Sequence, residues 1–134
     1  QFILNHDLHQ FFTEEAWSIQ ELKRLLAEFK KWGVPIEDES GLSLAAGDRL
    51  YRELQNVLAI GIPESLDQLQ HLRLILQSLN QLSFDIDLWK VQNLYYSMRR
   101  NYLKLKPEHQ HKEWEKVFFH LGQLLGFQTV DGRR

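Results

Sequence analysis

Residues 87–100, DLWKVQNLYYSMRR, bring together side chains of the types that most often contact ligands. They include Trp89, the adjacent Tyr95 and Tyr96, and an arginine pair that begins at Arg99. Aromatic faces stack on sugar rings or nucleic-acid bases, and guanidinium groups donate hydrogen bonds to hydroxyl, carboxylate and phosphate oxygens. The same residue types also fill hydrophobic cores. The segment can therefore be interpreted as a sugar-binding surface, a nucleic-acid-binding strip or part of the core.

A helical wheel separates these interpretations, because successive residues of a helix are rotated by 100°. One wide apolar stripe contains Leu88, Val91, Leu94, Tyr95, Met98, Tyr102 and Leu105. Trp89, Tyr96 and Leu103, spaced by seven residues, form a second and narrower stripe. Gln92 and Arg99 lie between the two stripes. A helix with two apolar faces usually packs on two sides, so the pattern predicts that this helix is central in a bundle.

The interpretation of the segment depends on whether the second stripe is buried or exposed. If both stripes are covered, the aromatic rings are core, and Gln92 and Arg99 need hydrogen-bond partners because unpaired buried polar groups are costly. If Trp89 and Tyr96 are exposed, they offer a surface for a sugar ring or another part of a larger protein, with Gln92 and Arg99 as hydrogen-bonding groups. Nucleic acid is the least supported ligand, because the net charge is −2 and the rings point away from most of the basic residues.

The rest of the chain supplies helices to support this segment. Apolar residues recur at intervals of three and four, whereas hairpin dipeptides and sustained strand-like alternation are absent from the sequence. We therefore predict an all-α fold, a bundle of about five helices with short loops and no internal repeat. The predicted helices run from about 13 to 32, 43 to 60, 65 to 82, 87 to 106 and 107 to 125. Gly47 lies on an apolar stripe, where it allows close approach of another helix.

Length and composition indicate one domain, residues 1–134, with 43% hydrophobic and 25% charged residues. The sequence contains no cysteine, which excludes disulfides and thiolate chemistry and fits a reducing compartment. No apolar run reaches the roughly 20 residues that a membrane helix needs, so we predict a cytoplasmic location. Because the first residue is Gln rather than Met, we expect a domain excised from a longer protein.

Catalytic and metal-binding motifs are missing from the sequence. His6 and His9 share a helical spacing, and His109 and His111 are two apart, but neither pair has a recognisable third ligand. There is no glycine-rich phosphate loop, no nucleophile elbow and no paired carboxylates that sequence can place across a cleft. We therefore predict no catalytic residue, no metal and no cofactor in this chain.

The stretch LWKVQNLYYSM resembles a helix in a C-terminal domain of unknown function. That domain occurs in large bacterial proteins whose N-terminal domain is of the glycoside hydrolase family 57 type. A similar closing segment matches Trp114, the stretch HLGQLLG and Phe127 here. The resemblance covers about a third of the chain and implies that it is the C-terminal helical accessory domain of an α-glucan-processing protein. The family's catalytic carboxylates belong to the N-terminal domain, so the resemblance assigns none to this chain.

Two functions follow as hypotheses. The first is a non-catalytic interaction domain that packs against the catalytic domain of its parent or against a second copy, aided by Trp17, Leu74 and Phe119, which lie off the main stripes. The alternative is a carbohydrate-binding module that uses Trp89 and Tyr96 and takes α-glucan oligosaccharides. A free-standing enzyme is the least supported function.

Overall fold

The computed structural model describes residues 2–37, 41–82 and 85–126. Within these residues the chain forms six α-helices and one short 3₁₀ helix, which confirms the predicted all-α class. The α-helices are α1 (Phe2–Thr13), α2 (Ile19–Trp32), α3 (Leu42–Ile60), α4 (Leu66–Leu79), α5 (Trp89–Leu103) and α6 (Lys112–Leu124), and the 3₁₀ helix is η1 (Pro107–His109).

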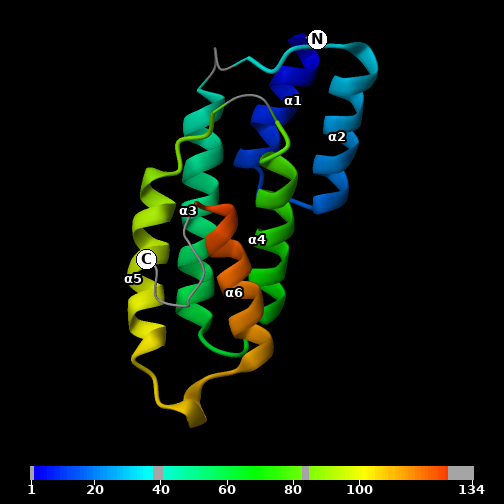
Figure 1. Cartoon of the computed structure of the whole chain (residues 1–134). Helices are drawn as coiled ribbons and strands as arrows, with labels where there is room; N and C mark the ends of the chain where they lie inside the picture. The colour runs from blue at the N-terminus through cyan, green and yellow to red at the C-terminus, as the bar shows by residue number, and fades with distance from the viewer. Residues whose placement is uncertain (1, 38–40, 83–84, 127–134) are drawn as a thin grey trace.

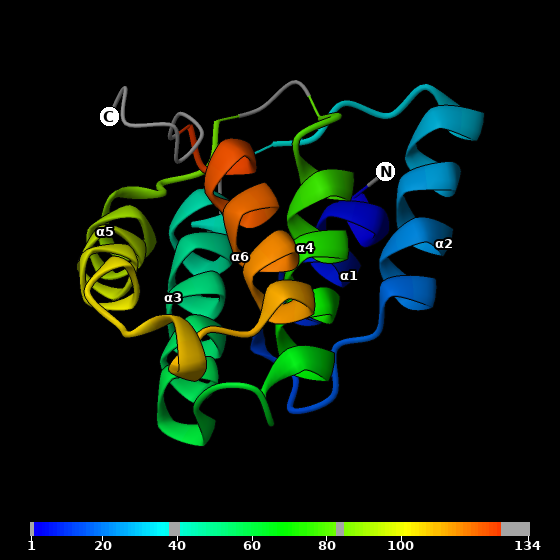
Figure 2. The same ribbon diagram turned by 60° about the horizontal axis from the view of Figure 1, so that its bottom comes forward.

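The helices are stacked in two layers (Figures 1 and 2). The odd-numbered helices make one layer, in which α1 packs on α3 and α3 on α5, and the even-numbered helices make the other, in which α2 packs on α4 and α4 on α6. Helix α1 pairs with α2 and α3 with α4 across the layers as antiparallel hairpins, and α5 meets α6 through stacked aromatic rings. The chain is thus a stack of three helical hairpins, an arrangement in which each unit contacts only its neighbours.

Hydrogen bonds at successive levels show that helices within a layer run parallel. In the even layer, Trp114 Nε1 donates to Ser65 Oγ at 2.9 Å at one end, and Asn80 Nδ2 donates to the Leu124 carbonyl at 3.0 Å at the other. In the odd layer, the Asp87 amide, just before α5, donates to Ser43 Oγ at 2.9 Å near the start of α3. Each hairpin therefore repeats the orientation of the one before it.

The core runs between the layers as a continuous cluster of leucines and aromatic rings. Leu22 and Leu25 of α2, Leu50 and Leu54 of α3, and Leu69 of α4 are fully buried in it. These positions recur at intervals of three and four, the spacing that puts side chains on one face of a helix. The helical periodicity of the sequence thus identified the faces that meet.

The predicted helix from Thr13 to Trp32 was wrong at its beginning. Thr13 ends α1, and α2 starts after Ser18, whose Oγ accepts a hydrogen bond from the Glu21 amide at 3.0 Å. The intervening segment is held by Trp17, whose ring is buried against Phe11 and His71. The C-terminal stop at Gly33 is confirmed, with the glycine in the left-handed region at φ 62°.

Arg49 joins the first hairpin to the second. Its side chain, almost wholly buried in α3, donates from Nη1 to the Phe12 and Glu14 carbonyls and from Nη2 to the Glu15 carbonyl. Its Nε also donates to Glu53 Oε2 at 2.9 Å, and its guanidinium carbon lies 4.6 Å from the centre of the Trp17 ring. The last carbonyls of a helix lack partners inside that helix and carry partial negative charge, so a cation stabilises them.

Gly47 brings the chain before α5 against α3. A Cβ atom at this position would lie 2.0 Å from the Asp87 carbonyl oxygen, so no larger residue fits without displacement of that backbone. The close approach predicted for Gly47 is therefore present, although it is made by the segment that leads into α5.

Two predicted helices differ from the structure at their ends. The predicted helix over 65–82 ends earlier, because α4 runs from Leu66 to Leu79, and the Ser65 hydroxyl before it accepts from Trp114 and makes no capping hydrogen bond. The predicted helix over 107–125 is divided into η1 and α6, and the Leu105 carbonyl accepts from Gln110 Nε2 at 2.9 Å in the connection between α5 and α6.

The prediction that the helix over 87–106 is central was wrong. Helix α5 lies at the edge of the stack, beside α3 in its own layer and across from α6 (Figure 2). Its wide stripe is buried, with Val91, Tyr95, Met98 and Tyr102 in the core. The narrow stripe stays largely exposed, with Arg100 near the Tyr96 ring, so α5 packs on fewer sides than its two stripes suggested.

Replacing Gly47 with Ala should destabilise the protein even though Ala is the better helix former. Helix propensity alone would add about 1 kcal/mol to the free energy of unfolding, whereas overpacking against a backbone typically costs about 1–3 kcal/mol. Urea denaturation followed by circular dichroism measures the difference. Asn56→Ala, an exposed position of the same helix, is the control and should gain a few tenths of a kcal/mol. A more stable Gly47→Ala variant would contradict the close approach.

Arg49→Met should lower the free energy of unfolding by about 2–4 kcal/mol, because three backbone carbonyls lose their donor. Arg52→Met removes the same charge one turn later from an exposed position and should change stability by less than about 0.5 kcal/mol. Equal losses in the two variants, measured by urea denaturation, would show that the Arg49 hydrogen bonds contribute little.

Candidate functional site

The narrow stripe of α5 is exposed to solvent. Trp89 is 69% exposed, Tyr96 47% and Leu103 50%, although all three are large and apolar. They lie at intervals of seven residues, about two helical turns, and so follow one side of the helix. Three such side chains in one row make a patch of the kind that marks interaction sites.

This row faces away from α3, toward the open end of the stack. Lys90 Nζ, on the α3 side of α5, lies 3.2 Å from Asp48 Oδ1. Trp89, Tyr96 and Leu103 fall on the opposite side of the buried stripe, at 100° per residue. Gln92 lies next to this row and bonds to the end of α6. We call the surface formed by Trp89, Tyr96 and Leu103 the end face.

Basic residues border the end face. The guanidinium carbon of Arg100 lies 5.8 Å from the centre of the Tyr96 ring, and Lys104 follows one turn later at the C-terminal cap of α5. Helix α5, every residue of which the structure describes, contains Lys90, Arg99 and Arg100 but no Asp or Glu. Arg100 and Lys104 therefore give the part of the end face around Tyr96 and Leu103 a positive border, whereas at its other end the Asp87 carboxylate accepts a hydrogen bond from the Trp89 amide at 3.2 Å.

The side chains of Gln92 and Arg99 are packed within the domain. Gln92 is half-buried, and its Nε2 donates to the Leu125 carbonyl at 2.7 Å, so its amide closes the C-terminal end of α6. The Arg99 side chain is buried, and its positive charge opposes the rise in the Tyr95 pKa that burial causes. The structure thus separates the four predicted binding residues into an exposed aromatic pair, Trp89 and Tyr96, and an inner polar pair.

A stacked aromatic seam fixes α5 on α6 and so positions the end face. The Tyr95 and Phe118 rings are stacked with centroids 4.4 Å apart, and the Tyr102 and Trp114 rings with centroids 5.4 Å apart. Tyr95 Oη donates to the Phe118 carbonyl at 2.8 Å, and Tyr102 Oη donates to Glu115 Oε1 at 2.8 Å. Burial, together with the neighbouring Glu115 carboxylate, raises the pKa of Tyr102 to about 12.

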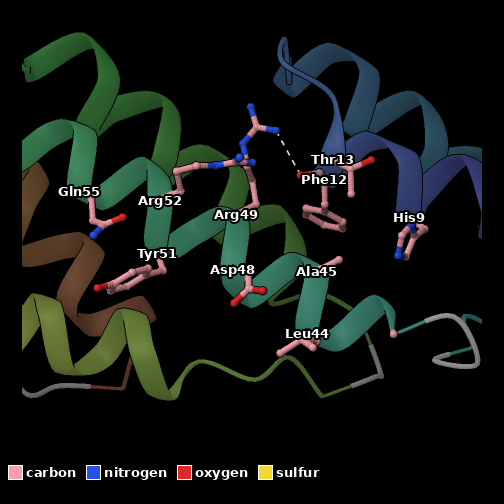
Figure 3. Close-up of a pocket in the computed structure, with 11 residues that line it drawn as sticks. His9, Phe12, Thr13, Leu44, Ala45, Asp48, Arg49, Tyr51, Arg52 and Gln55 are labelled. Carbon is pink, nitrogen blue, oxygen red and sulfur yellow. Dashed lines mark hydrogen bonds between the residues drawn. The ribbon is translucent and has the colours of Figure 1, made fainter.

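A second surface is a groove between α1 and α3 that both polar and apolar side chains line (Figure 3). It has a volume of about 580 Å³, and His9 and Thr13 of α1 face Asp48, Arg52 and Gln55 of α3 across it. Its charged groups are partly committed: Asp48 pairs with Lys90, and the Arg49 donors are directed to backbone carbonyls and Glu53. The groove is open to solvent and does not join the end face.

A third feature is a small apolar cleft of about 200 Å³ between the C-terminal halves of α3 and α5. Leu58, Met98 and Leu105 line it, together with the rings of Tyr102 and Trp114. On α3, Leu44 in the first turn and Leu58 near the cleft are exposed, and the Lys90 ammonium lies 4.9 Å from the centre of the Tyr51 ring between them. These three side chains also repeat every seven residues, but Tyr51 is half-buried whereas Tyr96 of the α5 row is exposed.

The described parts of the chain contain no cluster of three or more His, Asp or Glu that could hold a metal. His6 is exposed and His9 half-buried on α1, and His109 and His111 are exposed on either side of the turn after η1. None of the helices in residues 2–37, 41–82 and 85–126 is long and apolar enough to cross a bilayer.

The off-stripe residues do not form the predicted patch. Trp17 is buried in the core near Arg49, and Leu74 and Phe119 are half-buried on different helices. Sequence reasoning also missed Arg49, whose partners lie 34 to 37 residues away along the chain. An arginine on an otherwise apolar stripe of α3 was the only signal available for it.

Comparison of the chain with protein-family models, curated proteins and solved structures gives no match. The resemblance to the C-terminal domain of glycoside hydrolase family 57-type proteins therefore stays a prediction. Phe127, which is part of that resemblance, lies outside the described residues.

The stability of the protein should fall as pH rises from about 10 to about 12. Tyr102 keeps its proton in the folded state up to its raised pKa of about 12, whereas an unfolded tyrosine loses its proton near pH 10. Its contribution is therefore complete below about pH 10 and is lost progressively as the pH rises to about 12. Urea denaturation at several alkaline pH values should show a shallower decline for Tyr102→Phe than for wild type. Identical slopes would contradict the raised pKa.

Proposed function

We propose that this chain is a non-catalytic helical interaction domain that docks through the end face onto another protein body. In line with the predicted family resemblance, that body is the catalytic domain of an α-glucan-processing parent protein. The observation that carries the proposal is the exposure of Trp89, Tyr96 and Leu103 in one row. The cytoplasmic location predicted from the sequence stays part of this proposal.

The proposal is supported by the different surroundings of the two apolar stripes of α5. The wide stripe supplies Val91, Tyr95, Met98 and Tyr102 to the core, so the helix is held without the second stripe. Leaving three large apolar side chains in water forgoes a favourable transfer free energy, about 1.5–3 kcal/mol for each one that could be fully buried. A partner that covers the row recovers this free energy, which is the main driving force of most protein association.

A second candidate is the carbohydrate-binding module. It is favoured by the exposure of Trp89, because an indole face open to solvent is the first requirement for stacking on a pyranose ring. At Tyr96 the Arg100 guanidinium already lies near the ring, so a sugar would have to share or displace that contact. We therefore rank sugar binding second.

Adjacent tyrosines offer a matched test of the role of the end face. Tyr96→Ala should change the free energy of unfolding by no more than about 0.5 kcal/mol, because a surface kept for a partner adds little to the stability of the free domain. Tyr95→Ala, one residue earlier and buried, should cost about 3–5 kcal/mol. A loss above 2 kcal/mol in Tyr96→Ala would assign the row to the domain's own packing.

Titration with a linear α-1,4-glucan oligosaccharide distinguishes the two candidates. The interaction-domain proposal predicts no saturable change in tryptophan fluorescence up to millimolar sugar. A saturable change in wild type that disappears in Trp89→Ala would favour the carbohydrate-binding module. Trp32→Ala is the control, because Trp32 is similarly exposed but lies on α2 at the other end of the stack.

A further inference from the structure

We infer that the partner of the end face is an amphipathic α-helix whose apolar stripe is bordered by Asp or Glu, and that it lies alongside α5 as the next helix of the odd-numbered layer. The inference rests on the proposed docking function and adds the chemistry of the partner. The spacing of the row on α5, its position in the stack and the charges beside it support the inference.

The spacing of the row fits a helix. Trp89, Tyr96 and Leu103 repeat every seven residues, so they form a row about 21 Å long, at 1.5 Å per residue, that drifts around the helix by only about 20° per repeat. Side chains at this repeat stay in register with those of a second helix that crosses at a small angle, because packed helices interdigitate at the same interval. A partner helix of about four turns would cover the whole row.

The position of the row continues the architecture. Helix α3 packs on α1, and α5 packs on α3 in the same way, so each helix of this layer offers one side to the helix before it and one to the helix after it. The row occupies the side of α5 that has no helix after it in the part of the chain that the structure describes. Stacked hairpins that end a layer normally present a polar outer face, and α5 does not.

The charged residues beside the row indicate the chemistry of the partner. Arg100 lies against Tyr96, Lys104 follows one turn later, and α5 itself contains no carboxylate. A helix with acidic residues beside its apolar stripe would place opposite charges along this border. A second copy docked with its α5 parallel to this one would place Arg100 and Lys104 near their own counterparts, and like charges at an interface weaken association. The border therefore favours an acidic partner over parallel self-association.

A displayed library of helical peptides tests the inference. Each peptide carries Leu at positions that form one apolar stripe, and its flanking positions are varied among Glu, Lys and Gln. Selection on the wild-type chain should enrich Glu at the flanks. Selection on the Arg100→Glu, Lys104→Glu double variant should enrich Lys instead. Binding of the best Glu-flanked peptide should weaken about tenfold in the double variant, as expected for loss of two exposed ion pairs.

Two control proteins make the outcome specific. The Lys23→Glu, Lys30→Glu variant has the same change of net charge on α2, at the other end of the stack, and should bind like wild type. The Trp89→Ser, Tyr96→Ser, Leu103→Ser variant should enrich no peptide above background. A change in both charge variants alike would mean that only net charge matters, and this would overturn the inference.

The remaining outcomes separate the inference from the proposed function. Peptides that need Trp89 but show no preference for Glu would overturn the acidic partner and leave the docking function in place. No enrichment on wild type would overturn the helical partner. A concentration-dependent dimer, seen by sedimentation and abolished by Tyr96→Ala, would replace the acidic helix with a second copy.

Discussion

The cation of Arg49 is placed where the first helix ends and the chain turns back, and the arrangement of the first two hairpins depends on it. A helix end leaves backbone carbonyls without partners, and here one guanidinium donates to three carbonyls, that of Phe12 in the last turn of α1 and those of Glu14 and Glu15 just after it. The same group pairs with Glu53 and lies over Trp17. It thus fixes the end of α1, the turn before α2 and their contact with α3 together. The buried charge is tolerated because its donors bond to three carbonyls and a carboxylate and its guanidinium lies over an aromatic ring.

The sequence predicted what depends on local periodicity. The apolar stripes of α3, α4 and α6, the glycine that ends α2 and the close approach at Gly47 can all be recognised within a few residues. Helix α1 was missed because its apolar residues are interrupted by Asn5, His6 and Asp7, which blur its amphipathic pattern. The role of Arg49 was missed because its partners are distant in the chain. No local pattern encodes a contact of that kind.

The end face could be predicted only in part from a helical wheel. The wheel identified two stripes on α5 and placed Gln92 between them, and both statements describe the structure. It did not determine which stripe is covered, because that depends on whether another helix follows in the same layer. The hairpins repeat in space without repeating in sequence, so the position of α5 at the end of the stack could not be inferred from similarity between segments. Trp89 is exposed because no described helix follows α5 in its layer.

The terminal position of the α5–α6 hairpin also affects how the chain opens. In a stack, each unit is stabilised by itself and by its neighbours, and α5–α6 has a neighbour on one side only among the described hairpins. Local opening, as measured by amide hydrogen exchange, should therefore be easier there than in α3–α4. A ligand present at 100 times its dissociation constant would stabilise the closed hairpin by about 2.7 kcal/mol. In the proposed docking, recognition at Trp89 and the folding of the last hairpin would therefore be one linked equilibrium, in which occupancy of the surface sets how often this part of the chain unfolds.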